Sequence, residues 1–374
     1  RWLAQLSYLV IPLALGGIML LALLAWESDT VVRQAPDLPF TALSFVPDDG
    51  QIEPAAARDA LRGLKPVTSF DSQLSEAPVW FAFTPPKLES SVAGPPLVYF
   101  PSRHARSLSC WRGAALKPLG SATRAHADGA LTMVNAGFAT SGVDLSGVPL
   151  LCRATFVGPA RLSVTAWNAT DFNLATRAFA NDMGLLEGGL TVLAVFMLLA
   201  ALVNREPLYI VFAAWLIVNA RLGANSAGWD ALWLSHQVPS GWLDGMRKVI
   251  FASNFPLTVY LFTRLFQHDL TKVGKDSLVR VLELLYLPMF AAALLLPYRY
   301  FIPMLWLCSF IGYGIIVYYL GSILLVSRSR IAMWFAASLV VTAAAGFAEV
   351  LKAMFGLPGP VPYVTSVTAA LSSG

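Results

Sequence analysis

Long apolar segments are unevenly spread along this chain of 374 residues. One runs from Leu9 to Trp26, and a long interval of ordinary polarity follows it. From residue 185 onward, apolar segments come in quick succession, at about 185–203, 207–222, 249–266, 281–297, 301–326 and 331–353, with a last one beginning near Val361. A helix needs roughly 20 mostly apolar residues to cross the hydrocarbon core of a bilayer. The pattern therefore predicts a membrane protein with one isolated helix, a domain outside the membrane and a bundle of seven transmembrane helices.

The predicted elements divide the chain into an anchor helix at 1–26, a β-domain at 27–183 and a helical domain at 184–374, whose last helix is incomplete. The first apolar segment is longer than the ~7–15 residues that are usual in a cleaved signal peptide. Trp26 and Glu27 also stand where a cleavage site would need small residues. We therefore expect a retained signal anchor rather than a cleaved signal peptide.

Short runs of β-branched and aromatic residues fill most of the 27–183 interval. Gly, Pro, Ser or Asp separates these runs at the spacing of strands and turns. The runs are APVWFAFTP, PPLVYFPS, SLSCWRG, LTMVNAGF, PLLCRATFV and ARLSVTAWNA, and one short helical pattern, PAAARDALRGL, precedes them at 54–64. Several short strands over ~150 residues predict an antiparallel β-sandwich or jelly roll.

The positions of Lys and Arg orient the predicted helices, because basic loops stay on the cytoplasmic side of a membrane. With the N-terminus inside, the 27–183 domain lies outside. The inside loops then carry Arg205, Arg264, Lys272, Lys275, Arg280, Arg328 and Arg330, whereas the outside loops carry Arg247, Lys248, Arg299 and Lys352. In this orientation Asn204-Arg205-Glu206-Pro207 is a tight cytoplasmic turn, with Pro207 at the first position of the second bundle helix, where its missing N–H costs nothing.

Composition supports a membrane environment, and the absence of catalytic motifs argues against catalysis within these residues. Only 13% of the chain is charged and 56% is hydrophobic, whereas a soluble domain is typically ~25% charged. The sequence has no Walker-type glycine-rich loop, no zinc-protease helix motif, no serine-hydrolase elbow and no paired Cys-x-x-Cys. The four histidines are far apart in sequence, and no two of them have metal-ligand spacing. We expect a lipid bilayer around the chain, and no catalytic residues, metal, cofactor or nucleic-acid partner.

The order of these parts resembles the bacterial 7TMR-DISM family, which comprises receptors with seven transmembrane helices and diverse intracellular signalling modules. Val79-Trp80-Phe81-Ala82-Phe83 is similar to a strand of the family's outside domain, and Leu150-Leu151-Cys152-Arg153-Ala154 is similar to a later strand. The segment GGLTVLAVFMLLAALVNREPLYIVFAAW resembles the family's first membrane helices, including a short charged turn before an aromatic residue. NSAGWDALWL resembles the segment that follows the second bundle helix.

The resemblance implies a location in the bacterial inner membrane, with a DISMED2-like jelly roll in the periplasm that looks like a carbohydrate-binding module. It also implies an output module after the seventh helix. We expect the natural chain to continue beyond Gly374 into a diguanylate cyclase, which makes cyclic di-GMP, with a histidine kinase as the next candidate. Both modules act across a two-fold axis, so the resemblance implies a homodimer. Any enzyme activity of the complete protein would reside in that module.

Aromatic and polar residues of the β-domain form a candidate site for a carbohydrate or another small polar ligand. Sugar sites combine an aromatic stacking face with a few oriented polar groups. The candidates are Arg103, His104, Trp111, Arg112, Trp167, Asn168 and Asp171. Trp111 and Trp167 have a second interpretation as residues of the sandwich core, and the alternation around Trp80 favours the core at that position.

Charged and strongly polar residues within the predicted bundle form a second candidate set. Asn219 and Arg221 fall near the outer end of the second bundle helix, and Glu349 and Lys352 fall near the outer end of the sixth. Such groups face the bundle or a cavity and usually have partners there. Glu349 and Arg221 are therefore a candidate pair, and the alternative for Glu349 and Lys352 is that their side chains reach the membrane interface.

Two of the three cysteines, Cys110 and Cys152, fall in predicted strands of the outside domain. The periplasm is oxidising, so a disulfide between them is possible chemically. A bond also needs Cα atoms within ~7 Å of each other. The alternatives from sequence are one disulfide or two separately buried thiols.

Three classes of function fit this organisation. The first is a signalling receptor, in which the β-domain senses a ligand and the bundle relays the signal to a cytoplasmic output. The second is a carbohydrate-binding scaffold for the assembly of envelope polysaccharide. The third is a transporter with an accessory domain, which should show inverted repeats and polar sites at the membrane midplane. The sequence has no internal repeat, and its charges lie near helix ends, so we favour the receptor.

Overall fold

The structure is a computed structural model, and it describes residues 37–44, 52–72, 74–86, 97–102, 104–134, 137–158, 160–227, 240–273, 276–327 and 331–339, together with isolated positions at 10, 13–14 and 17–18. Within these residues the chain forms two compact units. One lies within Val32–Asp182, and the other holds the helices of Met183–Ser226 and those from Asp244 onward. The expected anchor helix, apart from those isolated positions, and the expected seventh bundle helix lie outside the described residues.

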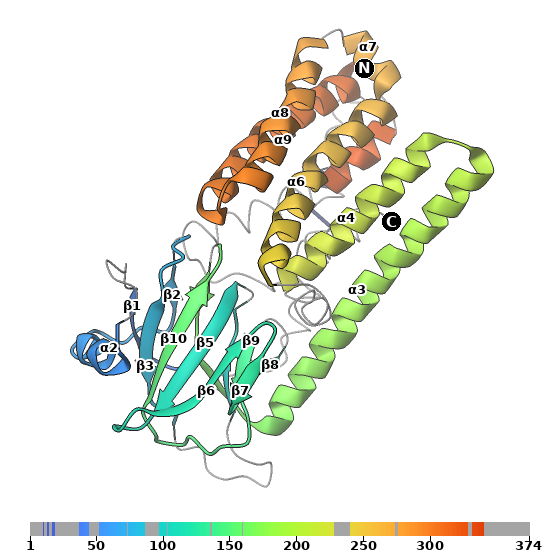
Figure 1. The fold of residues 1–374 in the computed structure, drawn as a ribbon. Coiled ribbons are helices and arrows are strands. Elements are labelled where there is room, and N and C mark those ends of the chain that lie inside the picture. The colour runs from blue at the N-terminus through green and yellow to red at the C-terminus, as the bar shows by residue number, and fades with distance from the viewer. Residues whose placement is uncertain are drawn as a thin grey trace. The chain divides into compact units, whose positions relative to one another are not determined.

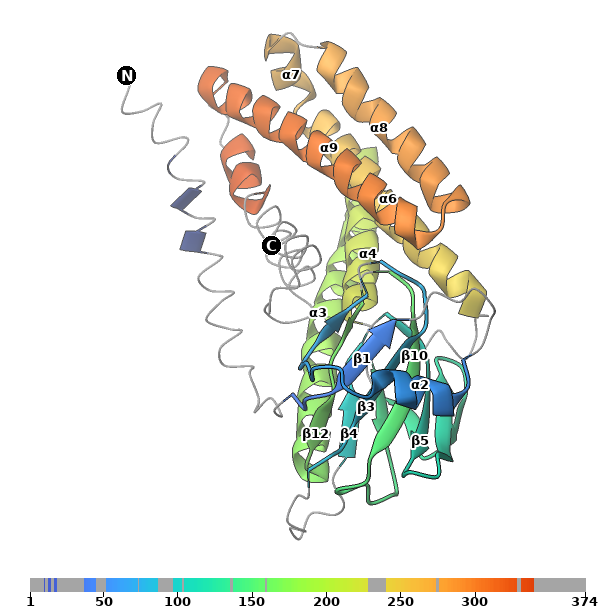
Figure 2. The ribbon, with the colours of Figure 1, turned by 90° about the vertical axis from the view of Figure 1, so that its left-hand side faces the viewer.

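The first unit is built from two main antiparallel sheets and one helix (Figure 1). In spatial order, the six-stranded sheet consists of β1 (Thr41–Ser44), β3 (Val79–Phe83), β10 (Leu150–Phe156), β5 (Ala105–Arg112), β6 (Lys117–Thr123) and β7 (Ala127–Gly129). The four-stranded sheet consists of β12 (Thr165–Trp167), β4 (Leu97–Phe100), β9 (Gly137–Thr140) and β8 (Leu131–Val134), and β11 (Arg161–Leu162) pairs with β2 (Phe70–Asp71). The helix α2 (Pro54–Leu61) covers part of the six-stranded sheet, as Figure 2 shows. The short helix is present as predicted, and four of the six predicted runs each form one strand of an antiparallel sandwich. The runs LTMVNAGF and ARLSVTAWNA, expected as single strands, are each divided between two strands, β8 and β9 in the first and β11 and β12 in the second.

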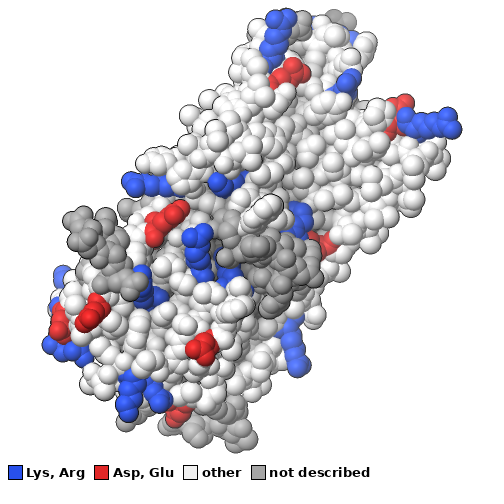
Figure 3. All heavy atoms as spheres, viewed as in Figure 1, with Lys and Arg blue, Asp and Glu red and all other residues white. Residues whose placement is uncertain are grey.

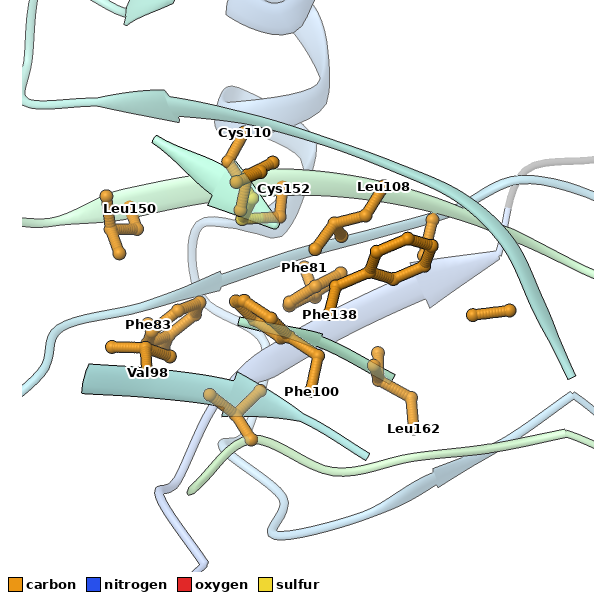
Figure 4. Close-up of a cluster of buried hydrophobic side chains, with 14 of the residues drawn as sticks. Phe81, Phe83, Val98, Phe100, Leu108, Cys110, Phe138, Leu150, Cys152 and Leu162 are labelled. Atoms are coloured by element: carbon orange, nitrogen blue, oxygen red, sulfur yellow. A yellow bond between two sulfur atoms is a disulfide. The ribbon is translucent and has the colours of Figure 1, made fainter. Parts of the chain in front are cut away.

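Aromatic side chains fill the space between the two main sheets (Figure 4). Phe81 at the centre of β3 is fully buried, and its ring lies 5.9 Å from the rings of both Phe40 and Phe100. Phe83, two residues further along β3, lies on the same side because successive side chains of a strand point to opposite faces. The alternation of β3 therefore places Phe81 and Phe83 in the core and Trp80 on the opposite face of the sheet.

A disulfide between Cys110 and Cys152 joins the two central strands of the six-stranded sheet. The two residues are directly opposite each other in the antiparallel pairing of β5 with β10. Both are buried in the sandwich core, close to Leu150 and Leu108 (Figure 4). Of the two alternatives left by the sequence, the structure contains the bonded pair.

The second unit is built from long apolar helices, and on the face shown in Figure 3 its charged residues are few and lie mostly toward its ends. Its helices are α3 (Ala169–Asn204), whose first turns belong to the first unit, α4 (Pro207–Ala227), α6 (Ser240–Leu265), α7 (Gln267–Val273), α8 (Asp276–Leu295) and α9 (Tyr298–Val326), and residues 331–339 are also helical. Four helices of the described chain are long and apolar enough to cross a membrane, or five if the bent pair α6 and α7 counts as one span. The first five spans expected for the bundle are therefore present as helices, and the sixth begins at 331.

Two helices begin earlier than their apolar segments. α3 begins at Ala169 rather than near 185, and α6 begins at Ser240 rather than near 249. Arg247 and Lys248 are consequently helical residues, so the assignment of both to a loop was wrong, and their placement on the outer side stays a prediction. The physical reason is that hydropathy detects only the apolar part of a helix. The backbone hydrogen bonds that define the helix continue through polar residues as well.

The turn between α3 and α4 has the form that its sequence predicts. α3 ends at Asn204, and α4 begins at Pro207. Arg205 has a positive φ of 54°, and its N–H donates to the carbonyl oxygen of Ala201, which closes the last turn of α3. A residue in this left-handed conformation is a common way to end a helix, although glycine usually occupies it.

Candidate functional site: the outer face of the six-stranded sheet

The face of the six-stranded sheet that points away from the sandwich core, called the outer face below, is only partly covered. α2 packs on it through Ala57 and Leu61, which contact a cluster that includes Trp80 and Leu151. Trp80 is buried there, with 3% of its surface exposed. It stacks on the half-buried Trp111, with ring centroids 5.3 Å apart. This aromatic pair forms the floor of the outer face beside α2.

Strand register places a row of side chains across the outer face next to the aromatic pair. Arg153 of β10 is opposite Trp80 of β3 on one side and Ser109 of β5 on the other. Ser109 is opposite Ser121 of β6, which is opposite Asp128 of β7. All of them point to one side, because directly paired residues of neighbouring antiparallel strands share a face.

A second row of hydroxyl groups runs parallel to the first. Thr155 of β10 is opposite Ser107 of β5, and Ser107 is opposite Thr123 of β6. The hydroxyl oxygens of Ser107 and Thr155 lie 2.6 Å apart in a hydrogen bond that ties β5 to β10. Together the two rows contain five hydroxyl residues, all half-buried or exposed, which are called the hydroxyl cluster: Ser107, Ser109, Ser121, Thr123 and Thr155.

Arg153 is the cation at the centre of this surface. Its guanidinium carbon lies 5.9 Å from the centroid of the Trp80 ring, at the distance of a cation–π contact. The Nε atom of Arg153 is buried and has no hydrogen-bond partner in the structure. Within the described part of the chain, no carboxylate forms an ion pair with this guanidinium. The stacked rings of Trp80 and Trp111, the guanidinium of Arg153 and the hydroxyl cluster therefore lie together on one face.

The seven residues proposed from sequence do not form one site. Trp111 lies on the outer face, and Arg112 follows it as an exposed residue at the end of β5. Trp167 belongs to β12 of the other main sheet, where its Nε1 donates to the hydroxyl of Thr165 at 2.9 Å. His104 donates from Nδ1 to the Val157 carbonyl oxygen at 3.0 Å. Arg103 lies outside the described residues.

Asn168 and Asp171 lie at the start of α3. The side-chain oxygen of Asn168 accepts a hydrogen bond from the backbone N–H of Thr170 at 2.9 Å, and Asp171 lies in the first helical turn. Asparagine at this position satisfies a backbone donor that has no partner within the helix, and a carboxylate there suits the positive end of the helix dipole. Both residues thus have local structural roles in beginning α3.

Asn219 of the second candidate set belongs to a hydrogen-bond network within the bundle. It accepts from Asn254 of α6 at 3.2 Å, and its amide donates to the Trp215 carbonyl oxygen. The indole of Trp215 donates to the hydroxyl of Thr258, which also bonds the side chain of Tyr313 on α9. The network connects α4, α6 and α9 through side chains that would be costly to leave unpaired in lipid.

The other members of the second set are placed only in part. Arg221 is a half-buried residue two positions after Asn219 on α4. Glu349 and Lys352 lie outside the described residues, so the pairing of Glu349 with Arg221 stays a prediction. Sequence reasoning missed Asn254 and Thr258, although polar residues within the apolar segment 249–266 were a usable signal. It also missed the burial of Arg247, which has only 8% of its surface exposed.

Sequence reasoning also missed Arg153 and the hydroxyl cluster. The run PLLCRATFV contained a usable signal, because strict alternation puts Leu150, Cys152 and Ala154 on one face and Leu151 and Arg153 on the other. Among the described residues, no group of three or more His, Cys, Asp or Glu side chains could hold a metal ion.

The apolar helices define a multi-pass membrane protein, and comparison with known proteins identifies its family. A family model described as 7TM diverse intracellular signalling matches residues 182–373, which is just over half of the chain. The chain therefore belongs to the 7TMR-DISM family of transmembrane signalling receptors. The match begins within α3 and does not extend over the β-sandwich. A search of curated proteins found no match.

Proposed function

We propose that this protein is an inner-membrane receptor whose β-sandwich binds a carbohydrate or similar polar ligand in the periplasm. The helical bundle then relays binding to a cytoplasmic output module, with a diguanylate cyclase as the first candidate and a histidine kinase as the second. The single observation that carries the proposal is a β-sandwich whose polar outer face is only partly covered by α2 and which directly precedes a bundle of this receptor family. The outer face supplies the aromatic, hydroxyl and cationic groups that sugar recognition uses.

The disulfide supports a periplasmic location for the β-sandwich. Disulfides persist in oxidising compartments such as the periplasm and are rare in the cytoplasm. The Cys110–Cys152 bond therefore favours a periplasmic β-sandwich. The basic residues Arg205, after α3, and Lys272, in α7, favour a cytoplasmic location for those two sites, which is the same orientation of the chain.

The start of α3 offers a route by which the β-sandwich could influence the bundle. Phe172 is buried, and its ring lies 5.2 Å from Tyr99 of β4 and 5.8 Å from Trp167 of β12. α3 begins beside these contacts and continues for 36 residues into the apolar segment. A ligand can shift an equilibrium between two receptor arrangements only by its difference in affinity for them. We propose that the two arrangements differ in the position of α3 within a homodimer.

The orientation can be tested by cysteine labelling in intact cells. In a Cys308→Ala background, we expect a membrane-impermeant maleimide to label an Ala125→Cys variant, because Ala125 is exposed between β6 and β7. A Thr271→Cys variant in α7 should react only after the cells are lysed. The wild-type disulfide supplies no free thiol to the reagent. Labelling of Thr271→Cys but not of Ala125→Cys in intact cells would refute the proposed orientation.

The ligand hypothesis predicts that Trp111→Ala weakens glycan binding by about fivefold, because the loss of one aromatic contact typically costs roughly 1 kcal/mol. Purified receptor in nanodiscs would be titrated with a glycan panel. Trp242→Ala is the matched control, since Trp242 is a largely exposed residue of α6. Thermal melts should first establish that both variants are folded. No binding by the wild type, or equal binding by the two variants, would argue against this site.

A further inference from the structure

We infer that the ligand of the outer face carries an anionic group and that Arg153 receives it. The inference rests on the proposed function, because it names the chemical class of ligand for the same surface. The class is an acidic saccharide, in which a carboxylate, sulfate or phosphate accompanies sugar hydroxyls. The observations that carry it are the position of Arg153, the absence of a counter-charge among its described neighbours and the composition of the surrounding surface.

Arg153 lies in the interior of the sheet rather than at its rim. Its strand, β10, is an inner strand of the sheet, with β3 and β1 on one side of it and β5, β6 and β7 on the other. The buried Nε has no hydrogen-bond partner in the structure. The chain therefore leaves hydrogen-bonding capacity of this guanidinium unused, and the Arg153 side chain as a whole is only half-buried.

The charged residues around Arg153 leave its positive charge uncompensated within the described part of the surface. Asp128 shares its row but is on β7, three strands away, which is roughly 14 Å at the usual strand spacing. The Asp128 carboxylate accepts a hydrogen bond from the N–H of Gly129. The acid of α2, Asp59, lies close to two other arginines, Arg58 and Arg62. An anion from outside the chain is therefore the natural partner for Arg153.

The groups beside Arg153 favour a saccharide over a simple anion. The guanidinium fork can bind a carboxylate or sulfate through two parallel hydrogen bonds. Trp80 restricts the guanidinium to one region of the face through its cation–π contact. Ser109 and the rest of the hydroxyl cluster present donors and acceptors next to the cation, which matches a ligand with several hydroxyls. The half-buried Trp111, which stacks on Trp80, adds a second aromatic ring to this surface.

The test compares an acidic and a neutral saccharide of equal length. Receptor in nanodiscs of neutral lipid would be titrated calorimetrically with trigalacturonic acid and with the corresponding neutral galactose trisaccharide. We expect the wild type to bind the acidic compound at least tenfold more tightly, and we expect added salt to reduce that preference. Arg153→Gln should remove the preference, and Arg153→Lys should retain part of it because the charge remains.

Arg177→Gln is the matched control, because it removes the same charge from an exposed position on α3 and should leave the preference unchanged. Melting curves would establish that Arg153→Gln is folded, and Arg153→Met, which keeps the apolar stem, replaces it if it is not. Equal binding of both saccharides by the wild type would overturn the inference while leaving the proposed function intact. A preference that survives in Arg153→Gln would also overturn it. Failure of the wild type to bind either compound would count against both the inference and the ligand part of the proposed function.

Discussion

Removal of the disulfide by the double substitution Cys110→Ala, Cys152→Ala is expected to lower the free energy of unfolding of the β-sandwich by about 4 kcal/mol. The bond closes a loop between residues 42 positions apart, and a cross-link of that length removes this much chain entropy from the unfolded state. Alanine is chosen because both positions are buried in an apolar core, where a serine hydroxyl would add a desolvation cost. A loss of this size is a large fraction of the stability of an ordinary domain.

Hydrogen exchange measured by mass spectrometry would locate the effect. Amides of β5 and β10 that exchange by global unfolding of the sandwich should exchange roughly 1,000-fold faster in the double variant, since each 1.4 kcal/mol corresponds to a factor of ten. Cys308→Ala is the control, because Cys308 is a free buried cysteine of α9 and its loss should leave β5 and β10 unchanged. Reductant should destabilise the wild type and have no effect on the double variant. An unchanged exchange rate in the double variant would contradict the prediction.

The sandwich was largely predictable because its strands follow simple alternation. Val79, Phe81 and Phe83 are buried in the core, and each run predicted as a strand between residues 77 and 169 contains at least one strand, although two of the runs are divided between two strands. Alternation also separates Trp80 from Phe81, which is why a tryptophan with a core-like pattern is buried under α2 instead of between the sheets. The alternation along one strand shows which residues share a face of the sheet, but it does not show which other element covers that face.

The composition of the candidate site was not predictable from the pattern of single strands, because it depends on pairing. Arg153 lies beside Ser109 and Trp80 only because β10 is between β3 and β5, and these strands are far apart in the sequence. Trp111 and Trp167 were grouped from their residue type, and the structure assigns them to different sheets. A sequence shows which residues could contact a sugar, whereas strand order decides which of them lie together.

In the bundle, the apolar segments predicted the helices, but the polar contacts between helices depend on their packing. Asn219 was a candidate because it lies within an apolar segment, and its bond to Asn254 shows that α4 and α6 approach each other there. The glycines of α9 are a second such case. Gly312 and Gly314 look alike in the sequence GYG, yet only the packing of α6 shows which of them must remain small.

Substitution of Gly312 by leucine is therefore expected to destabilise the bundle by about 3 kcal/mol, at the upper end of the usual cost of overpacking. A Cβ atom added at Gly312 would lie only 2.1 Å from two ring atoms of Phe255, so α6 and α9 would have to separate or the Phe255 ring would have to leave its position. That ring also meets Tyr313 edge to face, with centroids 6.3 Å apart, which limits its freedom to move. Close approach of helices through small residues is a main source of packing in membranes, where the hydrophobic effect does not hold helices together.

Gly314→Leu is the matched control, because a Cβ there would have no atom within 4 Å and the same gain in helix propensity applies to both variants. Thermal unfolding of the two purified variants in the same detergent should show a clearly lower midpoint for Gly312→Leu than for Gly314→Leu. Addition of Phe255→Ala should recover part of the loss in the Gly312→Leu background, since the smaller side chain removes the clash. The recovery, measured as the coupling free energy of a double-mutant cycle, identifies the contact between α6 and α9 as the cause. Equal midpoints for the two leucine variants would show that α9 does not pack against Phe255 at Gly312.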